Sequence, residues 1–85
     1  MALRLADNVL WEEVGNETVV LKLDEGKSYR LNRTGGAVWK KIAAGGTRKD
    51  ISNSLLQMGA AGESLNSDLD DFIDELKREG LLVNE

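Results

Sequence analysis

The chain has 85 residues, of which 41% are hydrophobic and 31% are charged, so its composition is that of a small globular domain. Its 11 basic and 15 acidic residues give a net charge of −4, which argues against a general phosphate-binding surface. The absence of cysteine and histidine excludes disulfides, zinc sites of the Cys/His type and histidine-based catalysis. We expect one domain spanning residues 1–85, located in the cytoplasm because it lacks a signal peptide, disulfide staples and a membrane span.

The first half of the sequence predicts three antiparallel strands. Residues 9–14 form the first candidate strand, and Gly15-Asn16 after it is a two-residue hairpin signal. Residues 18–23 alternate along the second strand, and the turn 24–26 connects it to a third strand over residues 27–32. The second strand has one face with Val19, Leu21 and Leu23 and another with Thr18, Val20 and Lys22, and the core face of the third strand carries Tyr29 and Leu31.

The second half predicts helices that are bounded by start and stop residues. The first helix covers residues 34–44 and ends at Gly45-Gly46. The second helix begins at a capping box formed by Thr47 and Asp50 and stops at Gly59.

A third helix begins at a capping box of Ser67 and Asp70 and ends at Gly80, which takes the left-handed position of a Schellman ending. Residues 81–83 then form an extended segment that returns to the core. The three helices carry apolar stripes of Val38, Trp39 and Ile42, of Ile51, Leu55, Leu56 and Met58, and of Leu65, Leu69, Phe72, Ile73 and Leu76.

Strands followed by helices indicate an α+β fold in which a three-stranded antiparallel sheet is followed by three helices packed on one of its faces. This order is also similar to a winged helix-turn-helix, the layout of many DNA readers. Residues 63–85, however, hold 8 acidic and 2 basic residues, so the last helix is repelled by the phosphate backbone of DNA. A winged-helix DNA-binding regulator is the alternative function.

No pattern in the sequence supports an enzyme. The carboxylates of the last helix are expected on its solvated face, whereas acid–base catalysis needs carboxylates in a protected cleft. Gly35-Gly36 lacks the spacing of a phosphate-binding loop, so close packing of the first helix on the sheet is the expected reason for these glycines. We expect no catalytic residue, no metal site and no cofactor.

The third predicted strand is an edge of the sheet, where backbone N–H and C=O groups have no neighbouring strand. Residues 27–32 contain no proline and no internal glycine. In one interpretation, Lys27 and Arg30 are charges that keep the exposed edge from pairing. In a second, the strand is a docking edge for an extended peptide, and in a third it pairs with the edge strand of another copy.

Four parts of the sequence together resemble the PqqD-like family, also called the RiPP recognition element, whose members bind the leader of a ribosomally made precursor peptide. These are residues 19–35 with the pattern Y-x-L-N-x-T-G, Val38-Trp39, the pattern G-T-x-x-D-I from Gly46, and residues 68–82 with the ending Gly-Leu-Leu. The resemblance covers residues 5–83. The Gly-Leu-Leu ending is more similar to stand-alone recognition proteins of lasso-peptide pathways than to the quinone-biosynthesis member.

The resemblance implies that the leader adds antiparallel to the third strand, in a groove against the third helix. It implies a non-catalytic adaptor that presents the leader to a modifying enzyme or leader peptidase, without a nucleic-acid or membrane partner, as a monomer or weak homodimer. We expect apolar leader residues in the groove. Basic leader residues are expected near Asp68 or Glu75 of the helix, and acidic ones near Lys27 or Arg30 of the strand. The implied peptide-binding residues are Lys27, Ser28, Tyr29, Arg30, Leu31, Asp68, Leu69, Phe72, Glu75 and Leu76.

Overall fold

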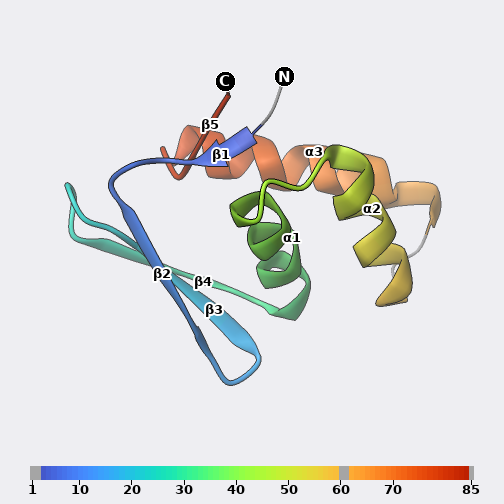
Figure 1. The fold of residues 1–85 in the computed structure, drawn as a ribbon, viewed down its shortest axis with the longest axis horizontal. Helices are drawn as coiled ribbons and strands as arrows, with labels where there is room; N and C mark the ends of the chain where they lie inside the picture. The colour runs from blue at the N-terminus through green and yellow to red at the C-terminus, as the bar shows by residue number, and fades with distance from the viewer. Residues whose placement is uncertain (1–2, 60–61, 85) are drawn as a thin grey trace.

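A computed structural model describes residues 3–59 and 62–84 (Figure 1). Its larger sheet is antiparallel in the order β2 (Val9–Val14), β3 (Glu17–Lys22) and β4 (Lys27–Leu31). Val14 pairs with Glu17, so the turn has the two predicted residues, and its glycine takes a positive φ of 63°. The three predicted strands are therefore confirmed, with bounds shifted by one residue at the second strand and at the end of the third.

A second, two-stranded sheet joins the ends of the described chain. β1 (Leu3–Leu5) pairs antiparallel with β5 (Leu82–Asn84), and Figure 1 shows the two strands side by side. The predicted extended segment after the last helix is thus confirmed. Its partner β1 was not predicted, because three residues are too few to show an alternating pattern.

Three helices follow the sheet: α1 (Arg33–Ala43), α2 (Arg48–Gln57) and α3 (Gly62–Arg78). The α+β prediction of a three-stranded antiparallel sheet followed by three helices is confirmed. The capping box of α2 is also present, because the Thr47 N–H donates to the Asp50 carboxylate at 3.0 Å and the Asp50 N–H donates to the Thr47 hydroxyl at 3.2 Å.

The predicted start of α3 is wrong. The helix begins at Gly62, so Ser67 lies inside it and caps nothing, and Asp70 instead forms an ion pair with Arg48 at 2.7 Å. The physical reason is Leu65, which is 8% exposed and belongs to the buried stripe, so the helix needs an additional turn before Ser67. The predicted Schellman ending is confirmed, since the N–H groups of Gly80 and Leu81 bond back to Lys77 and Leu76.

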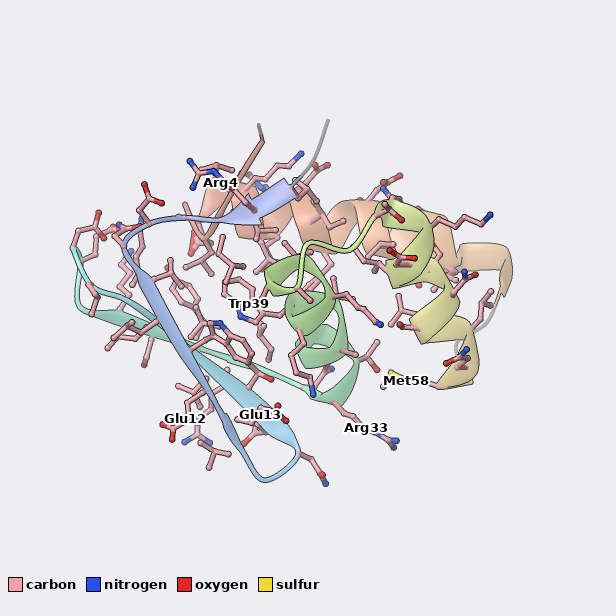
Figure 2. The ribbon with its side chains drawn as sticks, viewed as in Figure 1. Arg4, Glu12, Glu13, Arg33, Trp39 and Met58 are labelled. Carbon is pink, nitrogen blue, oxygen red and sulfur yellow. The ribbon has the colours of Figure 1, made fainter. Side chains whose placement is uncertain are left out.

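The core lies between the inner face of the larger sheet and the three helices. On β3 the inward side chains are Thr18 and Val20, and Trp39 is fully buried between sheet and helices (Figure 2). In the predicted stripe of α2, Leu56 and Met58 are exposed, because that short helix turns only one narrow face to the core. The buried apolar residues are Val20, Leu31, Val38, Trp39, Ile42, Ile51, Leu55, Leu65, Leu69, Ile73, Leu76, Leu81 and Leu82.

Gly36 is the point of closest approach between α1 and the sheet. A Cβ atom at this position would lie 2.5 Å from the Thr18 hydroxyl oxygen. The prediction that Gly35-Gly36 allows close packing of the first helix on the sheet is therefore confirmed. This approach fixes α1 against β3 and with it the position of the first turn of α1 beside the end of β4.

Candidate functional site

A cavity of about 460 Å³ lies where β4 ends, between the first turn of α1 and the facing sides of α2 and α3. Its volume is within the roughly 300–1,000 Å³ range of ligand pockets. The apolar lining consists of Leu31, Val38, Leu55, Leu65, Leu69 and Phe72, and the remaining lining residues are Arg30, Asn32, Thr34, Gly35 and Asp68.

The first turn of α1 brings Phe72 close to the end of β4. Asn32 is the N-cap of α1, and its side-chain oxygen accepts the Gly35 N–H at 2.8 Å. A Cβ atom on Gly35 would lie 3.1 Å from the Phe72 ring and 3.5 Å from the Leu31 Cβ. The absence of a side chain at Gly35 therefore lets the Phe72 ring reach across to the strand and form a wall of the cavity.

Only one flank of α3 faces the cavity. Asp68 and Phe72 line it, four residues apart on the same side of the helix. Asp70 lies on the opposite flank, where it pairs with Arg48 of α2. Glu75 lines a separate surface hollow together with Asp71 and other charged residues. The cavity therefore has Asp68 as its acidic lining residue.

The hydrogen-bond pattern of the larger sheet shows which backbone groups of β4 point to its free edge. Leu23 donates its N–H to the Asn8 C=O at 2.9 Å, so this side of β3 bonds to β2. Backbone groups alternate in direction along a strand, so Val20 bonds to β4, where its register partner is Tyr29.

The same alternation along β4 directs the N–H and C=O groups of Ser28 and Arg30 away from β3. Within the described chain the sheet order ends at β4, so no strand pairs with these four groups. The side chain of Arg30 lies on the outer face, where it pairs with Glu17 at 3.1 Å. The side chains of Tyr29 and Leu31 point to the inner face, toward α3.

At the other end of β4, residues just beyond α3 lie close to the sheet. Tyr29 is half-buried, and its burial, followed by the nearby Glu79 carboxylate just beyond α3, raises the pKa of the phenol above 10.0. A Cβ on Gly80 would lie 2.7 Å from the Lys22 ammonium, so the end of α3 abuts β3 as well. The cavity therefore opens at the Leu31 end of the strand.

The ten predicted site residues fall into four groups. Five of them line the cavity together, whereas Lys27, Ser28 and Tyr29 lie along the strand beyond it and Glu75 lies outside it. Leu76 is 4% exposed and belongs to the core. The five that line the cavity are Arg30, Leu31, Asp68, Leu69 and Phe72.

Sequence reasoning missed six lining residues because they come from three different helices and a connecting loop. The capping pattern of Asn32 and Gly35 was a usable signal for the first turn of α1, but no pattern in α2 indicates that Leu55 faces this cavity. The six residues are Asn32, Thr34, Gly35, Val38, Leu55 and Leu65.

Within residues 3–59 and 62–84, no group of three or more carboxylate, histidine or cysteine side chains could hold a metal ion. In the same residues, no helix has the length and apolar character needed to cross a membrane.

The family model for coenzyme PQQ synthesis protein D (PqqD) matches residues 17–82. Two solved structures have the same fold with a TM-score of 0.88. One is TbiB1 in complex with the TbiA(beta) leader peptide, 23% identical over 96% of both chains, and the other is a lasso peptide synthetase B1 complexed with the leader peptide, 18% identical over 99% of this chain and 100% of that one. No curated protein matches the chain.

Proposed function

This chain belongs to the PqqD family, as its sequence predicted, and we propose that it is a non-catalytic adaptor that binds the leader of a ribosomally made precursor peptide. The pathway that fits best is of the lasso-peptide type, because both similar structures are leader-peptide complexes and one is a lasso peptide synthetase B1. The observation that carries the proposal is the unpaired edge of β4 beside an apolar cavity. The adaptor presents the leader to a leader peptidase or another modifying enzyme.

The free edge fixes how a guest strand would bind. An antiparallel guest accepts and donates four hydrogen bonds at Ser28 and Arg30, which offer two N–H and two C=O groups. The N-terminal side of the guest then lies at the Leu31 end of β4, over the cavity, and its C-terminal side leaves past Lys27. The cavity therefore receives a side chain from the N-terminal part of the paired segment.

Backbone pairing alone is too weak for a specific complex. Four hydrogen bonds at roughly 0.5–1.5 kcal/mol each do not offset the ordering of five peptide residues, which costs roughly 1–2 kcal/mol each. A micromolar complex needs about −8 kcal/mol, so two or three apolar leader side chains at roughly 1.5–3 kcal/mol each must supply most of it. The apolar lining of the cavity suits such side chains.

The charged residues near the cavity and along β4 favour leader residues of the opposite charge. Asp68 lines the cavity, so a basic leader residue is favoured there. Arg30 already pairs with Glu17 on the outer face, so an acidic leader residue competes with that carboxylate. Lys27 at the other end of the strand is exposed and is the better partner for an acidic residue.

The test is a calorimetric titration of the chain with its cognate leader peptide. Phe72→Ala removes an aromatic wall of the cavity and is expected to weaken leader binding by about tenfold or more, because a lost apolar contact is worth roughly 1.5–3 kcal/mol. Leu56→Ala is the matched control, because Leu56 is an exposed apolar residue of α2 outside the cavity. Absence of binding to the wild-type chain at high micromolar leader would contradict the proposal.

A further inference from the structure

The outer face of the larger sheet carries apolar side chains where a solvated sheet face is normally polar. Leu10 is 58% exposed, Val14 56%, and Leu21 36%. Val20, the chain neighbour of Leu21, is fully buried on the inner face, so Leu21 points to the outer face. Leu10 is the direct cross-strand partner of Leu21 and therefore also points away from the helices. The outer patch consists of Leu10, Val14, Val19, Leu21 and Leu23.

This outer patch is confined to β2, β3 and the residue that follows β3. On β4 the side chains that share the outer face are Ser28 and Arg30, which are polar. Contiguous exposed apolar residues of this kind mark interaction sites on soluble proteins. A partner seated on the outer patch leaves the edge of β4 free, so it does not compete with a peptide bound there.

The charge within the outer patch indicates what kind of partner fits. Glu12 lies opposite Val19 in the register, and Figure 2 shows Glu12 and Glu13 on opposite sides of β2. Glu13 pairs with Lys40 of α1 at 3.2 Å and Glu17 pairs with Arg30, whereas Glu12 forms no ion pair within the described chain. The outer patch therefore combines an apolar surface with one unbalanced negative charge.

A second copy of the chain is a poor occupant. A two-fold contact would place the same surface against itself, bringing one Glu12 toward the other, and each copy has a net charge of −4. Like charges oppose that contact. A protein with apolar side chains and a nearby lysine or arginine is complementary to the outer patch.

We propose that the outer patch docks a protein partner whose apolar contact residues are accompanied by a lysine or arginine that pairs with Glu12. This inference rests on the proposed function in one respect: the partner is the enzyme that acts on the bound leader. The free edge of β4 and the outer patch then allow the adaptor to hold peptide and enzyme at the same time.

The test uses the leader peptidase encoded with the same precursor and measures leader removal at limiting adaptor. Leu21→Glu and Glu12→Lys are each expected to lower the rate of leader removal by about tenfold, the effect of a residue central to an interface. Both variants are expected to keep the leader affinity of the wild-type chain. Leu56→Glu, which places the same charge at an exposed apolar residue of α2, is expected to leave both quantities unchanged.

Wild-type rates of leader removal in both patch variants would overturn the proposal. A wild-type dimer in sedimentation that Leu21→Glu dissociates would also overturn it, by assigning the outer patch to a second copy. Direct titration of the peptidase into the adaptor without leader separates this inference from the proposed function. Loss of that peptidase binding in Leu21→Glu would support the docking surface even if the wild-type chain failed to bind any leader.

Discussion

At the scale of single residues, Tyr29 lies on the strand proposed to bind the leader and is near Glu79, which follows α3. It is the only tyrosine in the chain, so its ionisation can be followed without interference. Burial and the Glu79 carboxylate both favour its neutral phenol and raise its pKa. The stabilisation linked to this proton is present below pH 10.0 and is lost as the pH rises through the higher pKa of the folded chain.

Replacing Glu79 by glutamine removes the second of these causes. The midpoint of the phenolate absorbance titration is expected to lie above pH 10.0 in the wild-type chain and to move back toward 10.0 in Glu79→Gln. Glu12→Gln is the charge-matched control, because Glu12 lies on the outer face of β2 and Tyr29 on the inner face of β4. Identical midpoints in all three proteins would show that Glu79 does not influence the phenol.

Gly36 is the residue whose substitution tests the packing of α1 on the sheet. Gly36→Ala places a methyl group 2.5 Å from the Thr18 hydroxyl oxygen, and such overpacking costs roughly 1–3 kcal/mol of the free energy of unfolding. Chemical denaturation measures this loss. Adding Thr18→Ala to Gly36→Ala removes that oxygen and is expected to recover part of it, whereas an additive double variant would contradict the assigned contact.

At the scale of elements, the helix ends show what sequence patterns determine. Capping residues and glycines predicted the helix ends correctly where they coincide with the ends of the buried apolar stripe, as in the capping box of α2 and the glycine ending of α3. The capping pattern at Ser67 failed because the buried stripe includes Leu65, one turn earlier, and packing of a whole turn outweighs a single cap.

Alanine substitutions at the two serine/threonine positions test this difference. Thr47→Ala is expected to lower the free energy of unfolding by about 1 kcal/mol, because it removes an N-cap acceptor. Ser67→Ala is expected to be neutral or slightly stabilising, because Ser67 is an exposed residue inside α3. Equal losses in denaturant titrations would mean that Ser67 also caps a helix.

The α2 cap also has a pH signature. Hydrogen bonds from the Thr47 N–H and hydroxyl lower the pKa of Asp50 below 3.8. The stabilisation it contributes is therefore present above pH 3.8 and is lost as the pH falls through the lower folded-state value. Unfolding measured from neutral to acidic pH is expected to show a smaller acid-induced loss in Asp50→Asn than in the wild-type chain.

At the scale of the whole molecule, the sequence predicted the order of the elements because periodicity and turn residues are local. It did not predict the β1–β5 pair, whose strands are joined only by the complete fold. It identified the strand and helix of the candidate groove, but the cavity also needs Val38 of α1 and Leu55 of α2. Such convergence of four elements depends on tertiary packing and leaves no periodic signal in one chain.

Leader binding by strand addition depends most on the free edge of β4, and residue-resolved amide hydrogen exchange tests this edge directly. In the free chain, the Ser28 and Arg30 amides are expected to exchange quickly, whereas the Tyr29 and Leu31 amides are protected by bonds to β3. Saturation with the cognate leader is expected to slow exchange at Ser28 and Arg30 and to leave Tyr29 and Leu31 protected as before. A bound leader that leaves exchange at Ser28 and Arg30 unchanged would contradict docking on this strand.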